Sequence, residues 1–143
     1  MIRKMRDTDI EAVMEIWFSS TVKAHPFIDV AYWEKNYSLV KNEYLPQSQT
    51  LVFEEDNIIK GFISVIDNSF IGALFISPEF QGHGLGRKLL EAISSQSKEL
   101  TLAVYADNQQ AISFYKKMGF EIIHHQLDAS SGKFEYLMKK KDL

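Results

Sequence analysis

One segment constrains the fold more than any other: an apolar run, a loop with three alternating glycines and an amphipathic stretch follow one another across residues 70–97. The apolar run at 70–76 is typical of a buried strand. Gly82, Gly84 and Gly86 allow positive φ angles and bring backbone N–H groups close to a ligand. The stretch at 84–97 then carries apolar residues at helical spacing. The sequence therefore predicts a strand, a glycine-rich loop and a helix in direct succession.

The loop of this unit is predicted to bind phosphate or pyrophosphate. Successive N–H groups at a helix N-terminus, together with the positive end of its dipole, attract an anion. Arg87 and Lys88 place cations in the first turn, where the dipole disfavours them and an adjacent anion explains them. The segment does not match a Walker A loop. It does not match a Rossmann fingerprint either, because Arg87 stands where that motif needs its third glycine. A glycine-rich turn without a ligand is the alternative.

The rest of the chain is predicted to form an α/β fold with a mixed sheet and helices on its faces. Thr8 and Glu11 match a capping box at the start of the first helix. The predicted elements are an edge strand at 1–6, helices at 8–20 and 30–45, strands at 51–53, 58–66 and 70–76, a helix at 84–97, a strand at 100–105, a helix at 108–118 and a hairpin at 120–127 and 134–138.

Length and composition narrow the function further. The 143 residues predict a single domain, 1–143. A net charge of −3 disfavours nucleic acid and anionic membranes as partners, and no apolar run is long enough to span a bilayer. The first residues lack a signal core, so a cytoplasmic location is expected. The absence of cysteine excludes Cys nucleophiles and Cys-based metal sites, and no metal is expected.

Two motifs resemble those of the GNAT N-acetyltransferases. The loop fits the pattern Q/R-x-x-G-x-G of the family's acetyl-CoA loop, in the form Gln81-Gly82-His83-Gly84-Leu85-Gly86. A later segment fits N-x-x-A-x-x-F-Y-x-x-x-G-F, with Asn108, Ala111, Phe114, Tyr115, Gly119 and Phe120 at the defined positions. The element order is also the family's, so the resemblance covers the whole chain. The YjaB-type subgroup of small bacterial members is similar around Ala24, His25 and Phe27 and at Ala73-Leu74-Phe75-Ile76 before Pro78.

The resemblance implies a mostly antiparallel sheet, flanked by about four helices and splayed between the fourth and fifth strands, 70–76 and 100–105. Acetyl-CoA would enter this gap, its pantetheine arm pairing with the backbone of Leu74, Phe75 and Ile76. The N–H groups that would bind its pyrophosphate belong to Gln81, Gly82, His83, Gly84, Leu85, Gly86 and Arg87. Asn108 would contact the coenzyme near the mouth of the gap; the alternative role for Asn108 is a helix N-cap.

The resemblance also assigns Tyr115 as the general acid that protonates the leaving thiolate, as a phenol with a pKa near 10 can do. The alternative is a core aromatic. Family members often use a carboxylate base on the central strand, but residues 69–77 contain none. His25, between the first two helices, is the leading candidate for the base, because an imidazole titrates near neutrality; it could instead only bond its own loop. Weaker candidates are Glu54, Glu55, Asp67 and one of the neighbouring His124 and His125, which must face opposite ways on a strand.

These features predict an acetyl-CoA-dependent N-acetyltransferase acting on a primary amine. Without cysteine, transfer is expected to be direct, in a ternary complex. The alternative is a non-catalytic acyl-CoA-binding or sensing module on the same fold. The amine acceptor stays open among peptide N-termini, lysine side chains, polyamines, aminoglycosides and amino acids, with the acidic chain favouring a cationic one. Monomer and homodimer both remain possible.

Overall fold

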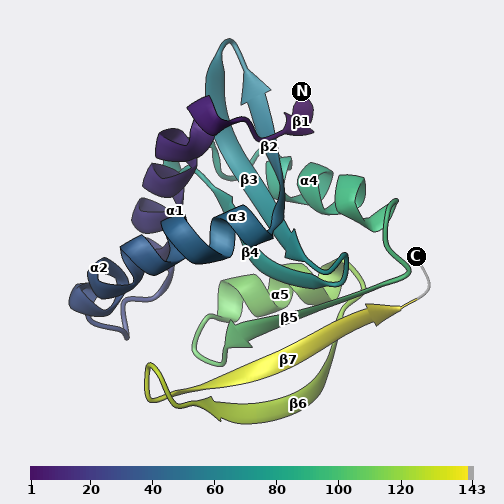
Figure 1. Ribbon diagram of the computed structural model, residues 1–143. Helices are drawn as coiled ribbons and strands as arrows, with labels where there is room; N and C mark the ends of the chain where they lie inside the picture. Colours follow the sequence, from purple (N-terminus) through teal and green to yellow (C-terminus); the bar gives the residue numbers. More distant parts are fainter. Residues whose placement is uncertain (142–143) are drawn as a thin grey trace.

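The computed structural model describes residues 1–141 and shows one seven-stranded sheet with helices on both faces (Figure 1). The strands are β1 (Ile2–Lys4), β2 (Gln49–Glu55), β3 (Ile58–Ile66), β4 (Phe70–Ile76), β5 (Glu99–Tyr105), β6 (Glu121–Asp128) and β7 (Lys133–Lys141). The helices are α1 (Ile10–Ala24), α2 (Val30–Leu39), α3 (Leu45–Gln47), α4 (Leu85–Ser94) and α5 (Gln109–Lys117). The strand order is β1-β2-β3-β4-β5-β7-β6, with β4 and β5 parallel and the other neighbours antiparallel. The predicted mixed α/β sheet is confirmed.

Helix α1 differs from its prediction at both ends. Residues Asp7–Asp9 form a 3-10 turn before it, and the Asp9 carboxylate closes that turn by accepting the Arg6 N–H at 2.8 Å. The predicted capping box is therefore wrong, and Glu11 instead pairs with Lys41 at 2.6 Å. At the other end α1 continues one turn past the predicted stop, to Ala24. Pro26 disfavours helix only at the residue before it, so the helix can run up to that point.

The second helical segment is longer and less regular than predicted. After α2 the backbone passes through a π turn, Val40–Tyr44, into α3 with helical dihedral angles throughout. The helical run ends at Gln47, so Pro46 lies inside its last turn, whereas the sequence predicted that the helix would stop before Pro46. Four helical bodies thus flank the sheet, as expected. None of the helices within residues 1–141 has the length and apolarity to cross a membrane.

Strand alternation divides the core between the two faces of the sheet. On β2, Leu51 and Phe53 belong to the cluster that packs against α4 and α5, whereas Val52 belongs to the cluster beneath α1 and α2. Phe62 and Ile63 on β3 divide in the same way. Successive side chains of a strand point to opposite faces, so both faces of these central strands are buried.

The sheet opens between its two central parallel strands. β4 pairs with β5 at Phe70 and Ile71 and at no later residue of β4, although β4 continues to pair with β3 up to Ile76. A bulge sits at the point of separation, since Ser64 opposes Ala73 and Val65 opposes Ile71, which leaves Gly72 as the extra residue. A bulge bends and twists its strand, which turns β4 away from β5. The predicted splay is confirmed.

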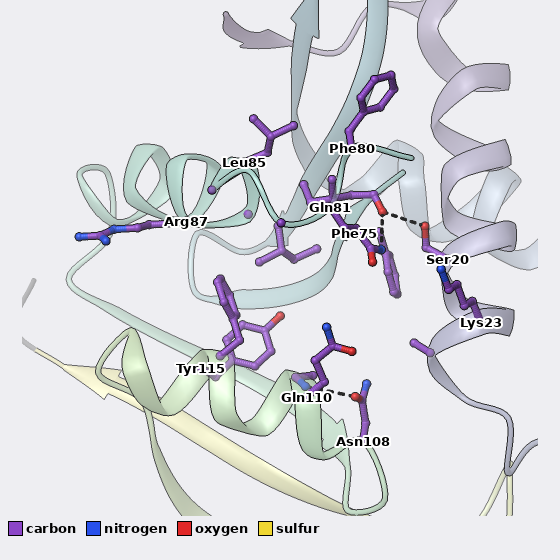
Figure 2. Close-up of a pocket in the computed structure, with 18 residues that line it drawn as sticks. Ser20, Lys23, Phe75, Phe80, Gln81, Leu85, Arg87, Asn108, Gln110 and Tyr115 are labelled. Atoms are coloured by element: carbon purple, nitrogen blue, oxygen red, sulfur yellow. Dashed lines mark hydrogen bonds between the residues drawn. The ribbon is translucent and has the colours of Figure 1, made fainter. Parts of the chain in front are cut away.

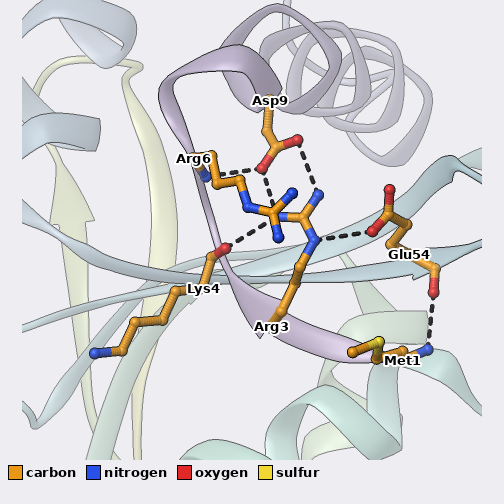
Figure 3. A network of polar contacts seen from close by, with 6 residues as sticks. All are labelled: Met1, Arg3, Lys4, Arg6, Asp9 and Glu54. Atoms are coloured by element: carbon orange, nitrogen blue, oxygen red, sulfur yellow. Dashed lines mark hydrogen bonds and ion pairs between the residues drawn. The ribbon is translucent and has the colours of Figure 1, made fainter.

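A polar network fastens the N-terminus to the sheet and to the start of α1 (Figure 3). The Arg3 guanidinium bonds both carboxylate oxygens of Asp9, at 2.7 and 3.1 Å, and its Nε donates to Glu54 at 2.9 Å. The Arg3 side chain and Asp9 are both largely buried. The guanidinium beside it holds the pKa of Asp9 below its usual value. Strands β1 and β2 and the turn before α1 are therefore joined by one ion pair network.

Candidate functional site

A cavity of about 570 Å³ occupies the gap where β4 and β5 separate (Figure 2). Its walls come from β4, the glycine-rich loop, α4, the start of α5 and the end of α1. The predicted site residues that line it are Leu74, Phe75, Ile76, Gln81, Gly82, Gly84, Leu85, Gly86, Arg87, Asn108 and Tyr115. The structure therefore brings together side chains and backbone that lie up to 41 positions apart in the sequence, between residues 74 and 115, around one space.

The glycine-rich loop has the backbone geometry of an anion site. Gly82 and Gly84 adopt φ angles of +86° and +80°, which L-residues with a side chain rarely take. A Cβ at either position would meet no protein atom within 4 Å, so both glycines border open space. Gly84 caps α4, and the first N–H groups of a helix lack acceptors within it. The N–H groups at the start of α4 are thus available to a ligand in the cavity.

The free edge of β4 forms the wall of the cavity that faces β5. Beyond Ile71 this edge makes no ladder with another strand. At its end the Ile76 carbonyl accepts two side-chain bonds, from Ser20 Oγ at 3.2 Å and Gln81 Nε2 at 3.0 Å (Figure 2). These bonds join α1 and the glycine-rich loop to the last residue of β4. An extended ligand could pair with the backbone upstream of that carbonyl, as an added strand does.

Tyr115 points its phenol from α5 toward the cavity (Figure 2). The ring is 9% exposed and packs edge-on against Phe114 and Phe120, with centroids 5.2 and 5.4 Å away. This packing fixes the ring, and burial raises the pKa of the Tyr115 phenol above its usual value of about 10. The hydroxyl therefore keeps its proton throughout the neutral range. A protonated phenol in a fixed position is a hydrogen-bond donor to whatever lies in the cavity.

His25 lies beside the cavity without lining it, contrary to its predicted place among the reacting groups. The ring is 7% exposed and packs against Trp33 and Tyr105, each with centroids 5.2 Å away. Its Nδ1 lies 2.7 Å from the Thr21 carbonyl oxygen, and its Nε2 lies 3.4 Å from the Asn108 amide nitrogen. Burial lowers the pKa of His25, an effect that the bond to Thr21 partly opposes. The imidazole is therefore engaged at both nitrogens.

The other predicted bases also lie away from the cavity. Glu54 bonds Arg3, and Glu55 pairs with Lys60 at 2.7 Å. Asp67 lies in the turn between β3 and β4 with a positive φ of 54°. His124 and His125 oppose Leu137 and Tyr136 respectively and are exposed on opposite faces, as predicted for neighbours on a strand. None of these side chains lines the cavity.

Two predicted loop residues have surroundings that the sequence did not indicate. His83 is exposed and is not among the lining residues, so its predicted contribution rests on its N–H alone. Arg87 lines the cavity, but its guanidinium pairs with Glu91 one turn later on α4, at 3.3 Å. The Glu91 carboxylate thus compensates the Arg87 charge, which the dipole of α4 disfavours in the first turn.

Sequence reasoning missed the contribution of α1 to the cavity. Ser20, at the predicted end of the first helix, and Lys23 and Ala24, in the predicted connection after it, all line it from the last turns of α1 (Figure 2). Their i, i+3, i+4 spacing places them on one face of a continued helix, which is the signal that could have found them. The remaining unpredicted lining residues are Phe80, Gln110, Ala111 and Phe114.

In the part of the chain that the structure describes, residues 1–141, the lining residues carry two cationic side chains, Lys23 and Arg87, and no acidic one. Within residues 1–141, no three His, Asp or Glu residues gather closely enough to hold a metal ion. The arrangement combines a cationic rim, free backbone N–H groups, an unpaired strand edge and a protonated phenol. Such a site suits an anionic ligand with an extended, amide-containing arm.

Comparisons with known proteins agree with this arrangement. A family model described as an acetyltransferase (GNAT) domain matches residues 21–134. The chain is 37% identical to the peptidyl-lysine N-acetyltransferase YiaC of Escherichia coli strain K12, over 86% of this chain and 84% of that protein. It is 36% identical to the peptidyl-lysine N-acetyltransferase YjaB of the same strain, over 85% of this chain and 82% of that protein.

Solved structures show the same fold. The solution structure of apo YjaB from Escherichia coli superposes with a TM-score of 0.85 at 30% identity, covering 100% of this chain and 98% of the other. The PaiA N-acetyltransferase of Thermoplasma acidophilum, solved in complex with coenzyme A, superposes with a TM-score of 0.82 at 25% identity, covering 99% and 98%. The chain therefore belongs to the GNAT N-acetyltransferases, a family of acyl-transferring enzymes.

Proposed function

We propose that this enzyme transfers an acetyl group from acetyl-CoA to the side-chain amine of a lysine in a peptide, by direct attack in a ternary complex. One observation carries the proposal: the glycine-rich loop and the phenol of Tyr115 line the same cavity at the split in the sheet. The choice of lysine rests on YiaC and YjaB, both named peptidyl-lysine N-acetyltransferases. A lysine ammonium also suits the acidic balance of this chain.

The residues of the cavity fit acetyl-CoA in three respects. The open space beside Gly82 and Gly84 admits a diphosphate close to the backbone, and the N–H groups at the start of α4 can bind it. The free edge of β4 at Leu74 and Phe75 matches the amides of a pantetheine arm. Lys23 offers positive charge from the opposite wall. When bound, acetyl-CoA supplies the activated acyl thioester.

Tyr115 is proposed as the general acid. Its proton is retained at Oη because burial raises the pKa of the phenol, and it can be donated to the sulfur that leaves with coenzyme A. The thiol of cysteine, an analogue of the coenzyme A thiol, has a pKa of about 8.5. A proton donor near the sulfur therefore helps the coenzyme A thiolate to leave. Positioning of the two reactants against β4 supplies the rest of the acceleration.

The incoming amine is proposed to lose its proton to water. Among residues 1–141, those that line the cavity include no carboxylate and no imidazole that could accept it. A lysine amine has a pKa of about 10.4, and only a small fraction is neutral at pH 7. The rate is therefore expected to rise with pH across the range 7–10 as the neutral amine becomes more abundant.

Two measurements test this proposal. The first is acetylation of a lysine peptide, monitored by the release of coenzyme A. The second is the binding of coenzyme A, measured by calorimetry. Tyr115→Phe removes the donor and little else, so kcat should fall about 100-fold or more while coenzyme A affinity stays close to that of the wild type. Tyr136→Phe is the matched control, because Tyr136 packs against the same core cluster without lining the cavity.

The outcomes separate the two functions that the sequence left open. Coenzyme A binding with turnover that depends on Tyr115 supports the enzyme. Binding without turnover on any amine supports a non-catalytic acyl-CoA module. Full turnover by Tyr115→Phe removes the general-acid assignment, and kinetics of the ping-pong type contradict direct transfer.

A further inference from the structure

A chain of hydrogen bonds connects α1 to the start of α5 across the split in the sheet. It runs from the Thr21 carbonyl to His25 Nδ1 at 2.7 Å, then from His25 Nε2 to Asn108 Nδ2 at 3.4 Å. It ends where Asn108 Oδ1 accepts the N–H of Ala111 at 3.2 Å, in the first turn of α5. The first two residues belong to the half of the molecule that contains β4, and the last two follow β5.

The donor and acceptor of each bond follow from the backbone N–H of Ala111, which can act only as a donor. The Ala111 N–H can only donate, so the Asn108 atom that faces it is the oxygen and the other is the NH2 group. The NH2 group donates to His25 Nε2, which must then be an acceptor. His25 is therefore neutral, with its proton on Nδ1, and that N–H donates to the Thr21 carbonyl.

The surroundings of His25 favour this neutral form. Besides Thr21 and Asn108, the ring contacts Phe27, Trp33 and Tyr105, from the α1–α2 connection, α2 and β5. None of these side chains carries a charge at neutral pH, and the titratable one, Tyr105, donates its hydroxyl to Asp128 at 2.9 Å. A second proton on the ring would direct an N–H at the NH2 group of Asn108. Burial of the ring lowers the pKa of His25 in the same direction.

We propose that His25 is a positioning residue that orients the Asn108 amide for coenzyme A, and that it is not the base. Asn108 lines the cavity, and its NH2 group has two hydrogens, of which His25 takes one. The second hydrogen stays directed at the ligand as long as Ala111 and His25 both hold the Asn108 amide by their hydrogen bonds. This inference rests on the proposed function, since it assumes coenzyme A in the cavity.

Two substitutions of His25 separate its nitrogens. His25→Gln places an amide oxygen near the position of Nε2, where it can accept from Asn108. His25→Asn reaches only the position of Nδ1, so it keeps a partner for Thr21 and loses Asn108. Both remove the ring and its aromatic contacts, which makes each the control for the other. Coenzyme A should bind about fivefold more weakly to His25→Asn than to His25→Gln, the usual worth of one hydrogen bond.

Calorimetry with coenzyme A measures this difference without reference to turnover. Equal affinities of the two variants, with both folded by circular dichroism, overturn the positioning role. No binding to the wild type instead overturns the proposed function, so the two failures are distinguishable.

The ¹⁵N chemical shifts of His25 test the protonation state of its ring directly. In the wild type they should show a neutral ring protonated at Nδ1 between pH 6 and 8. An ionised ring, or protonation at Nε2, contradicts the inference.

The pH profile of kcat/KM distinguishes positioning from general-base catalysis. If His25 only positions Asn108, the pH profile of His25→Gln has the same shape and the same acid limb as that of the wild type, and only the value of kcat/KM is lower. If His25 were the base, His25→Gln would lose the acid limb that reports its titration, together with most of kcat. A lost limb therefore refutes the inference, and a retained one supports it.

Discussion

At the scale of single residues, the charge of the cavity is carried by Lys23 and Arg87. Arg87 is already paired with Glu91 on the surface of α4. Among residues 1–141, no carboxylate lies within ion-pair distance of Lys23. Lys23 also projects from α1, on the far side of the cavity from Tyr115 (Figure 2). Its charge is thus available to the phosphates of a ligand.

We predict that Lys23→Gln raises the KM for acetyl-CoA about fivefold and leaves kcat nearly unchanged. A unit charge near a phosphate at a protein surface contributes about 1 kcal/mol, and the contribution is screened by salt. The difference between variant and wild type should therefore shrink as the salt concentration rises. Initial-rate measurements at low and high ionic strength check this.

The same variant can be tested with S-acetylpantetheine, a donor that lacks the phosphates. Here Lys23→Gln and the wild type should have the same KM, because the group that Lys23 recognises is absent. Lys35→Gln, on the exposed surface of α2 and away from the cavity, is the charge-matched control. A loss of activity with S-acetylpantetheine as well would show that Lys23 acts on the acyl end or on the fold.

At the scale of elements, the start of α4 depends on the left-handed backbone of Gly84. Alanine at this position costs about 1–2 kcal/mol in strain, although its Cβ would meet no atom of the described residues within 4 Å. We predict that Gly84→Ala weakens coenzyme A binding about tenfold, because the N–H groups that follow are turned away from the diphosphate. Isothermal titration with coenzyme A measures the effect.

The matched control for this prediction is Gly132→Ala. Gly132 has a φ of +75° and no protein atom within 4 Å of an added Cβ, so the strain is similar. It lies in the turn between β6 and β7, away from the lining residues. Gly132→Ala should lose a similar amount of stability and keep its coenzyme A affinity. If both variants bind coenzyme A equally, the geometry of Gly84 is not what holds the ligand.

Local patterns predicted the elements around the site better than the contacts between them. The apolar run of β4, the glycine-rich loop and the motif of α5 are each written in consecutive residues, and the structure places them as expected. His25 could not be placed, because its partners Thr21 and Asn108 meet only when α1 packs near the start of α5. The π turn at Val40–Tyr44 was not predicted either, since no pattern in its own residues distinguishes it from the α-helix before it.

The turn before α1 yields a prediction about stability. Asp9→Asn removes the charge that Arg3 bonds at two oxygens, so the free energy of unfolding should fall by about 1–2 kcal/mol. Because Arg3 lowers the pKa of Asp9, this contribution is complete above the ordinary carboxyl pKa of about 4 and is lost as pH falls through the lowered value. The advantage of the wild type over the variant should therefore shrink below about pH 4.

Urea unfolding of both proteins between pH 3 and 7 checks the sign. Asp7→Asn, in the same 3-10 turn but exposed, is the control and should change little at any pH. A difference between Asp9→Asn and the wild type that persists undiminished at low pH would assign the loss to packing, with no role for the charge.

At the scale of the whole molecule, the strand ladder that joins the two halves of the sheet is short. One half holds β1 to β4 with α1 to α4, the other holds β5 to β7 with α5, and the ladder between them ends at Ile71 and Leu102 (Figure 1). Beyond that point the described strands form no ladder between the halves, which stay joined by the buried core cluster that includes Leu89 of α4, Leu102 of β5 and Ile112 of α5. A ligand that pairs with β4 and also contacts α5 therefore adds contacts to both halves at the place where the sheet lacks them.

Coenzyme A is consequently predicted to stabilise the whole molecule and not only its loop. At about 100 times its Kd it should add about 2.7 kcal/mol, which corresponds to a rise in Tm of roughly 5–10 °C for a domain of this size. Hydrogen exchange should slow at the amides of residues 74–76, where the free edge of β4 gains a partner, and also at the start of α5 around Asn108. Amides of β2, which is paired on both sides without the ligand, should slow only as far as global stability rises. Protection confined to residues 81–87 would mean that coenzyme A is held by its diphosphate alone and does not enter the split.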